Sequence, residues 1–443
     1  MKYVIVGGDA AGMSAAMEIV RHDEKAEIIT LEKGFIYSYG QCGLPYVIDG
    51  RIESTDRVIA RSVEAFREKY GVDARVGHLV TGIDSESKTV HGTVLPESTS
   101  FQLSYDKLLI ATGAAPVQPN WPGVHLEGIQ HFKTIPDTNQ LVERLPGVKK
   151  VCVIGGGYIG LEVAEALVCA GKQVRLIHRG ERVAKVFDEE IAAAIQEKAA
   201  EKGIALHLNE KVTGFLGEKR VEQVQTDKGE YQADLVVIAI GIKPATQFLD
   251  HTDIHRLNNG AILTNRQMET SIKDIYAAGD CAAHFHRLKG RYDYIPLGTT
   301  ANKQGRIAGL SMCGMQAQFQ GVVGTSILKF FDLAAARTGL HANELELLDY
   351  SYEQYTFEGY HIAGYYPGKE KIKLTLYYDP RNRRLLGAQA IGGEGVDKRI
   401  DVAATALYAE MTIDELLDLD LAYAPPFNGV WDPLQQAARR LQP

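Results

Sequence analysis

The sequence has no close pair of cysteines. Its five cysteines are Cys42, Cys152, Cys169, Cys281 and Cys313, and no two of them form a C-x-x-C motif. This scatter argues against a structural zinc site and fits a reducing compartment, so we expect no metal and a cytoplasmic enzyme. Cys152 falls in an apolar, strand-like run, and Cys169 and Cys313 fall in helix-like stretches. We expect these three to be small buried hydrophobic side chains.

A long hydrophobic run and an excess of positive charge are also missing. No apolar stretch approaches the length needed to span a membrane. The N-terminal residues 1–6 run straight into a glycine turn, which indicates a strand rather than a cleaved signal peptide. The net charge of -8 argues against nucleic acid as the main partner. A chain of 443 residues, 45% of them hydrophobic, is expected to form two to four domains.

Two segments predict a strand, a glycine turn, a helix and a second strand. The first segment covers residues 2–34 and has its turn at Gly7 to Gly12, and the second covers residues 150–177 with its turn at Gly155 to Gly160. Backbone amides at the start of each helix would bind a pyrophosphate. We therefore predict an α/β fold with two Rossmann-like dinucleotide-binding domains.

The first turn departs from the G-x-G-x-x-G fingerprint, because Asp9 replaces the middle glycine. Glu32 stands twenty residues after Gly12, where a carboxylate can accept hydrogen bonds from ribose hydroxyls. This spacing favours a dinucleotide site over an ordinary tight turn. The Asp9 carboxylate would lie close to the pyrophosphate unless it points away or accepts a backbone hydrogen bond.

The second turn matches the fingerprint in full, and the strand after it ends in basic residues instead of an acid. These residues are His178, Arg179 and Arg182. Arginines at this point can neutralise the 2′-phosphate of NADP, and His178 could add to them. We therefore predict a preference for NADPH, with a solvated surface cluster of arginines as the competing interpretation.

Two strand-like runs, Asp106 to Gly113 and Asp234 to Gly241, end in small residues and precede proline-containing segments. They mark the points where the chain crosses to the second domain and back. From about residue 325 the pattern changes to aromatic and β-branched strands such as Lys371 to Tyr378, with helices predicted at Ile400 to Glu410 and Ile413 to Leu419. The expected domains are a first dinucleotide-binding domain in two parts (1–115 and 244–322), a second one (116–243) and a C-terminal α+β dimerisation domain (323–443).

These pieces in this order resemble the pyridine nucleotide-disulfide oxidoreductases, flavoproteins related to glutathione reductase, over essentially the whole chain. Most members carry a C-x4-C pair beside the flavin, but the position five after Cys42 is Val47. Cys42, followed by Gly43-Leu44-Pro45-Tyr46, resembles the single-cysteine branch of coenzyme A-disulfide reductases, NADH oxidases, peroxidases and polysulfide reductases. The resemblance implies FAD in the first domain, NADPH (NADH possible) in the second, and coenzyme A as part of the substrate.

The resemblance also implies a set of contacts. Asp280 resembles the aspartate that binds the flavin ribityl chain. The implied cofactor contacts are Gly7, Gly8, Ala11, Gly12, Glu32, Lys33, Ala111, Thr112, Gly113, Gly155, Gly157, Tyr158, Ile159, Gly160, His178, Arg179, Gly241, Gly279 and Asp280. The implied coenzyme A contacts are Ser14, Glu18, Arg21, Ser38, Gln41, Lys69, Asn302 and Trp431. Glu18 and Gln41 depart from the uncharged amide and the commoner asparagine of the family.

Two tyrosines near the C-terminus resemble a coenzyme A-disulfide reductase signature. Tyr423 begins the run Tyr-Ala-Pro-Pro-Phe, and Tyr365 begins the run Tyr-Tyr-Pro-Gly. In the family both tyrosines reach the active site of the partner subunit, which implies a homodimer in which they assist a departing thiolate. The alternative is that each tyrosine only packs in an interface with its hydroxyl hydrogen-bonded.

The resemblance implies that Cys42, whose thiol pKa is lowered by its setting, cycles through a mixed disulfide with coenzyme A, assisted by Tyr365 and Tyr423. Oxidases and peroxidases of the branch carry a histidine where this chain has Ala10, which argues against a sulfenate cycle. A persulfide or polysulfide reductase stays open. So do a reductase for a protein electron carrier, with Cys42 as a packing residue, and a flavin-bearing sensor.

Overall fold

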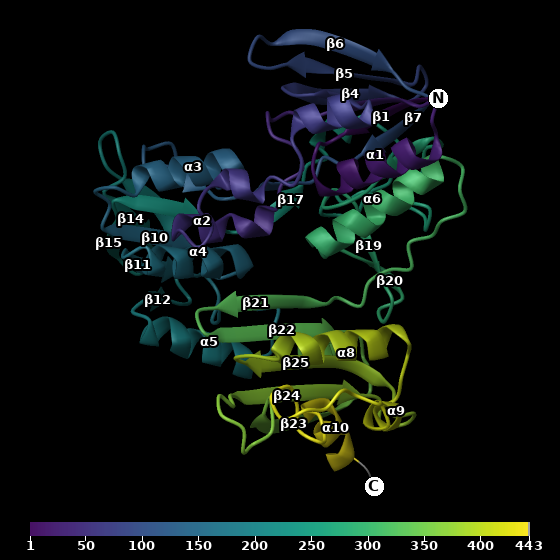
Figure 1. The fold of residues 1–443 in the computed structure, drawn as a ribbon. Helices are drawn as coiled ribbons and strands as arrows, with labels where there is room; N and C mark the ends of the chain where they lie inside the picture. Colours follow the sequence, from purple (N-terminus) through teal and green to yellow (C-terminus); the bar gives the residue numbers. More distant parts are fainter. Residues whose placement is uncertain (442–443) are drawn as a thin grey trace.

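Three five-stranded sheets form the frame of the protein (Figure 1). The structure is a computed structural model and describes residues 1–441. Two of the sheets are parallel and lie in the upper and left parts of Figure 1, and the third is antiparallel and lies at the bottom. This arrangement agrees with the predicted α/β fold of two Rossmann-like units followed by an α+β unit.

The first parallel sheet contains the N-terminal strand at its centre. Residues Tyr3 to Val6 are at most 4% exposed, because both faces of the strand are covered, as in other parallel sheets. In sheet order the strands are β18 (Ile275–Ala277), β7 (Lys107–Ile110), β1 (Lys2–Val6), β2 (Glu27–Leu31) and β3 (Asp73–Arg75). Helices α1 (Ala10–His22) and α6 (Gly298–Met312) pack against each other (Figure 1). Their close approach needs Gly305, where a Cβ would lie 2.1 Å from the Ala11 carbonyl oxygen.

The second parallel sheet repeats this arrangement around the second glycine turn. In sheet order its strands are β12 (Ala205–His207), β11 (Gln173–Ile177), β10 (Lys150–Ile154), β16 (Leu235–Ile238) and β9 (Ile129–His131). The helices of this part are α3 (Ile135–Arg144), α4 (Tyr158–Cys169) and α5 (Glu189–Glu201). Two three-stranded antiparallel sheets flank the parallel ones: β4 (His78–Asp84), β5 (Thr89–Val94) and β6 (Thr99–Ser104), and β13 (Val212–Leu216), β14 (Gln223–Thr226) and β15 (Glu230–Gln232).

The two connections between these parts run side by side. Strand β8 (Ala114–Pro116) leaves the first sheet, β17 (Ile242–Pro244) returns to it, and the two pair in antiparallel register with Ala115 opposite Lys243. The pairing therefore ties both crossings together, next to the strand ends that precede them. As a result, the two glycine turns face a common space.

The C-terminal sheet is antiparallel, with one face covered by helix α8 (Figure 1). In sheet order its strands are β21 (Ser326–Phe330), β22 (Leu333–Gly339), β25 (Leu385–Gly392), β24 (Lys371–Tyr378) and β23 (Glu353–Tyr360). The helices are α7 (Ala342–Leu347), α8 (Val396–Tyr408), α9 (Ile413–Leu417) and α10 (Pro433–Arg440). Helix α8 begins four residues before the predicted Ile400, because Gly395 takes a left-handed conformation (φ 77°) that starts the helix.

The remaining elements are short: α2 (Pro45–Ile48), β19 (His284–His286), β20 (Arg291–Asp293), the 3-10 turns Gln41–Gly43, Thr55–Val58 and Gln247–Leu249, and the π-helical turn Ala65–Lys69. All five cysteines are free. Cys152 is buried as predicted and Cys313 is half-buried, but the prediction for Cys169 was wrong, because this last residue of α4 is exposed. Within residues 1–441 no helix is long and apolar enough to cross a membrane.

Candidate active site between two glycine turns

One cavity of about 3020 Å³ contains both glycine turns and Cys42. Every cofactor contact predicted from the sequence lines it, except Gly12 and Gly160. These two glycines instead let each helix approach the start of its turn. A Cβ at Gly12 would lie 2.0 Å from the Gly7 carbonyl oxygen, and one at Gly160 would lie 1.9 Å from the Gly155 carbonyl oxygen. The cavity therefore brings together residues that are far apart in the sequence.

The first turn is shaped for a nucleotide. Gly7 has a φ of 123°, and a Cβ there would lie 2.1 Å from the Ala111 carbonyl oxygen. Helix α1 follows with no side chain capping its first amides, which leaves them available to an anion. Glu32 accepts hydrogen bonds from the Gly8 N–H (2.9 Å) and the Gly34 N–H (2.7 Å), which fixes its carboxylate at the edge of the cavity. These residues fit the pyrophosphate and ribose of FAD.

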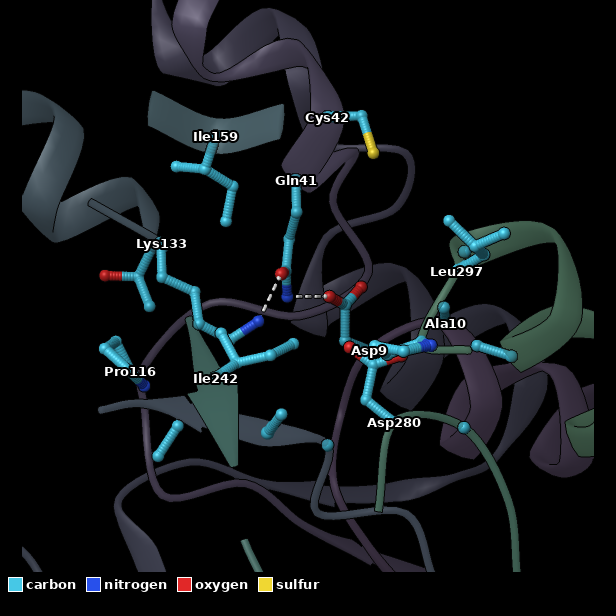
Figure 2. A pocket seen from close by; sticks show the side chains of 18 of the residues that line it. Asp9, Ala10, Gln41, Cys42, Pro116, Lys133, Ile159, Ile242, Asp280 and Leu297 are labelled. Atoms are coloured by element: carbon cyan, nitrogen blue, oxygen red, sulfur yellow. Dashed lines mark hydrogen bonds between the residues drawn. The ribbon is translucent and has the colours of Figure 1, made fainter. Parts of the chain in front are cut away.

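Asp9, the unexpected residue of this turn, points toward the loop that carries Cys42 (Figure 2). Its carboxylate accepts hydrogen bonds from the Tyr39 N–H (3.1 Å) and from Nε2 of Gln41 (2.8 Å). Burial raises the pKa of Asp9, and the two hydrogen bonds oppose this shift. The backbone hydrogen bond considered from the sequence is therefore present, and Asp9 holds the cysteine loop.

Lys133 completes this network from the segment between β9 and α3. Its Nζ donates a hydrogen bond to Oε1 of Gln41 at 3.1 Å (Figure 2). Both ends of the Gln41 amide are therefore engaged within the protein, although the resemblance implied a contact with coenzyme A. Burial raises the pKa of Asp280, which also lines the cavity, and the charge of Lys133 opposes this shift. Nothing in the sequence pattern had singled out Lys133.

Cys42 lies in the 3-10 turn Gln41–Gly43, and its thiol opens to the cavity. None of the other four cysteines is among the described residues that line the cavity. The expected lowering of the pKa of Cys42 was wrong for the surroundings that the protein provides. Desolvation and the nearby carboxylates of Glu162 and Asp280 raise the pKa, while Lys133 opposes them.

Glu162 is the main acidic neighbour of Cys42, and it was missed from the sequence. It lies in α4, five residues after Gly157 and one turn into the helix, and it lines the cavity. Burial, with a smaller effect of Glu165, raises the pKa of Glu162 to about 7. Its helix position could have been predicted from the sequence. Its proximity to Cys42 could not, because it depends on how the two parallel sheets are arranged.

The second turn is also open to a nucleotide. No atom lies within 4 Å of a Cβ built at Gly157, the residue that caps α4. Nδ1 of His178 accepts a hydrogen bond from the Gly156 N–H (3.2 Å), and burial followed by the charge of Arg179 lowers the pKa of His178. This histidine therefore adds no charge at neutral pH. Arg179 lines the cavity and is exposed, whereas Arg182 is not among the described lining residues.

The residues predicted to contact coenzyme A separate into groups. Gln41 and Asn302 line the cavity, and Asn302 accepts a hydrogen bond from Ser14 Oγ (2.7 Å). Glu18 and Arg21 form an ion pair on α1 (2.7 Å). The remaining three do not line the cavity in the same chain and are Ser38, Lys69 and Trp431.

The two candidate tyrosines lie together on the C-terminal part of the chain. Their hydroxyl oxygens are 3.3 Å apart, and Tyr365 and Tyr423 are 75% and 47% exposed. Neither is among the described residues that line the cavity with Cys42 in the same chain. The hydrogen bond to Tyr423 raises the pKa of Tyr365. The pair is thus accessible to something outside its own subunit.

Two family models cover most of the chain. Residues 1–305 match the pyridine nucleotide-disulphide oxidoreductase family, and residues 325–434 match the dimerisation domain of the same family. The chain belongs to this family. Members of the pyridine nucleotide-disulphide oxidoreductases use FAD and NAD(P)H, which agrees with the two glycine turns described above.

Relatives in the family bear several names. The chain is 39% identical to a CoA-dependent NAD(P)H sulfur oxidoreductase of Pyrococcus abyssi, over 99% of this chain and 98% of that protein. It is 33% identical to a coenzyme A disulfide reductase of Staphylococcus aureus, over 96% of both proteins. The structure of an NAD-dependent persulfide reductase from A. fulgidus superposes with a TM-score of 0.96 at 36% identity, covering 99% of this chain and 83% of that one. The family oxidoreductase is therefore of the coenzyme A disulfide or persulfide reductase type.

No group of three or more histidine, cysteine, aspartate or glutamate side chains within residues 1–441 is placed to hold a metal ion.

Proposed function

We propose that this family member is an FAD-dependent reductase of coenzyme A disulfide, or of a related small disulfide, that works through Cys42 alone and prefers NADPH. The observation that carries this proposal is one accessible thiol in a cavity shared by two nucleotide turns, with the other four cysteines lining no part of it. Such a thiol can form a disulfide only with sulfur from outside the chain.

The residues of the first turn, Glu32 and Asp280 would hold FAD. Bound there, the flavin supplies the redox chemistry, accepting hydride from the nicotinamide and passing two electrons to sulfur. The uncapped amides of α1 would bind its pyrophosphate. Gly157, Tyr158 and Ile159 would line the nicotinamide site, with Arg179 as a contact for the 2′-phosphate of NADPH.

The proposed reaction begins at the sulfur of Cys42. Its thiolate attacks one sulfur of coenzyme A disulfide, forms a Cys42–S–S–coenzyme A bond and expels one coenzyme A thiolate, which takes a proton. Two electrons from NADPH and one further proton then cleave the mixed disulfide, release the second coenzyme A thiol and restore the Cys42 thiolate. In sum, NADPH, one proton and one disulfide give NADP⁺ and two thiols.

We further propose that the active unit is a homodimer, in which Tyr365 and Tyr423 of one subunit reach the cavity of the other. The support is the exposed position of both hydroxyl groups, away from Cys42 of the same chain, together with the match to a dimerisation domain. A hydroxyl group in this position can donate a proton to the departing thiolate.

A persulfide or polysulfide reductase is the second candidate, supported by the names of two of the relatives above. In that reaction Cys42 attacks the outer sulfur of the substrate and carries it as a persulfide. Ala10, in the place of the oxidase histidine, argues against an oxidase.

Steady-state assays separate these activities. The purified protein is supplied with coenzyme A disulfide, with polysulfide or with oxygen alone, and each is run with NADPH and with NADH. We expect the highest kcat/KM with coenzyme A disulfide and NADPH. The Cys42→Ser variant should lose disulfide reduction, whereas Cys169→Ser, which removes an exposed thiol outside the cavity, should keep it. Full disulfide reduction by Cys42→Ser would refute a cysteine mechanism and favour a reductase for a protein carrier.

A further inference from the structure

Tyr365 and Tyr423 both lie outside regular secondary structure. Tyr365 is in the connection between β23 and β24, and Tyr423 is in the connection between α9 and α10. Each hydroxyl is exposed, so neither tyrosine is held in place by burial of its own ring. Their 3.3 Å hydroxyl contact therefore needs another source of order.

Arg399 of α8 lies beneath both connections and is 1% exposed. Its Nη2 donates hydrogen bonds to the His361 carbonyl oxygen (2.7 Å) and to Oδ1 of Asn428 (3.0 Å). His361 stands four residues before Tyr365 and Asn428 five residues after Tyr423. One guanidinium thus binds both of the segments that carry the tyrosines.

Two buried side chains extend this contact. Nε of Arg399 donates to Oδ2 of Asp432 (3.1 Å), which neutralises the buried charge. Nδ2 of Asn428 donates to the same Asp432 oxygen (2.9 Å) and to the carbonyl oxygen of Ala422 (3.3 Å), the residue before Tyr423. Asn428 and Asp432 are each 1% exposed.

A backbone hydrogen bond joins the two connections directly. The Ala363 N–H donates to the Pro425 carbonyl oxygen at 3.3 Å. This is a long contact, so it adds little by itself to the order of the tyrosines. The side-chain network around Arg399 is the shorter and more deeply buried link.

We propose that Arg399, acting through Asn428, is the positioning residue that holds Tyr365 and Tyr423 together as a hydroxyl pair for the thiol leaving group. This inference rests on the proposed function of the tyrosines. Only a planar guanidinium can reach the His361 carbonyl, the Asn428 amide and the Asp432 carboxylate at once. A lysine ammonium in its place keeps the charge opposite Asp432 but loses the fork.

The test compares Arg399→Lys and Asn428→Ala with Arg381→Lys, an exposed arginine of the same C-terminal sheet that pairs with Asp379. Two rates are measured for each protein: reduction of coenzyme A disulfide, and reduction of ferricyanide, which needs nicotinamide and flavin but no proton for a leaving thiol. We expect Arg399→Lys and Asn428→Ala to lower kcat for the disulfide on the order of 10- to 100-fold and leave ferricyanide reduction unchanged. Arg381→Lys should change neither rate.

A second readout follows the tyrosines themselves. The protein is labelled with fluorotyrosine, and the resonance of Tyr365 is assigned by its loss from the Tyr365→Phe variant. In the unmodified sequence the pKa of Tyr365 should be raised by its partner. In Arg399→Lys, and in Asn428→Ala if the lysine variant does not fold, it should return toward the ordinary value of an exposed tyrosine.

The outcomes distinguish the inference from the proposed function. An unchanged Tyr365 titration in the folded variants, or an equal loss of both rates, overturns the positioning role. If Tyr365→Phe and Tyr423→Phe reduce coenzyme A disulfide at the full rate, the proposed chemistry of the tyrosines is wrong, and the titration alone then judges the role of Arg399. Additivity is informative as well: Arg399→Lys should add little to the loss already caused by Tyr423→Phe.

Discussion

Replacing Glu162 with glutamine tests the electrostatics of the cavity. The folded protein raises the pKa of Glu162 from 4.5 to about 7, mainly through burial. Because the raised pKa belongs to the folded state, the folded protein binds this proton more tightly than the unfolded chain does. The stability that this proton provides is fully present below pH 4.5 and is lost as the pH rises through about 7.

The magnitude follows from the two pKa values. Each pKa unit corresponds to about 1.4 kcal/mol, so the whole difference corresponds to at most about 3 kcal/mol. Glu162→Gln has no such proton to lose. We therefore expect its free energy of unfolding, relative to the unchanged protein, to rise by up to about 3 kcal/mol between about pH 5 and pH 8.

Chemical denaturation at several pH values, with the same concentration of FAD throughout, measures this difference. Glu143→Gln is the matched control, because Glu143 is an exposed residue of α3, and it should show no pH-dependent change. The same variant should also lower the pKa of Cys42, since Glu162 is the carboxylate that raises it most, and so speed its alkylation near neutral pH. A stability difference that does not vary with pH would refute a raised pKa for Glu162.

Three further predictions concern the nucleotide turns and Lys133. Gly12→Ala would place a Cβ 2.0 Å from a backbone carbonyl oxygen, so the purified variant should lose bound flavin, as read from its absorbance, whereas Gly157→Ala, with no atom within 4 Å, should fold normally and raise only the KM for nicotinamide nucleotides. Arg179→Ala should raise the KM for NADPH about tenfold and leave that for NADH unchanged, and an equal change for both would contradict a 2′-phosphate contact. Lys133→Met should raise the pKa of Cys42, seen as slower alkylation at neutral pH, and faster alkylation would show that Lys133 does not act on the thiol.

Much of the frame could be predicted from local pattern. The β-strand at Lys371 to Tyr378 has the bounds predicted from its alternation, and both glycine turns occur where the fingerprint indicated. Burial and backbone geometry act on neighbouring residues, so they leave a mark in the sequence. The start of α8 was misplaced because the left-handed conformation of Gly395 determines it, and a glycine alone does not indicate φ.

The surroundings of Cys42 could be predicted only in part. The cysteine and the turns were found from motifs, but Glu162 and Lys133 come from the second part of the chain and reach the thiol only when the two parallel sheets are in place. The sign of the pKa shift at Cys42 was therefore wrong from the sequence. Asp9 illustrates the same limit, because its partner Gln41 is thirty-two residues away.

The central claim is that Cys42 takes its disulfide partner from coenzyme A. The most direct measurement is the mass of the protein as purified, before and after treatment with a reductant, with the peptide that contains Cys42 analysed separately. We predict a coenzyme A adduct on Cys42 that the reductant removes. An added oxygen or sulfur on Cys42, or a disulfide between Cys42 and another cysteine of the chain, would contradict the claim.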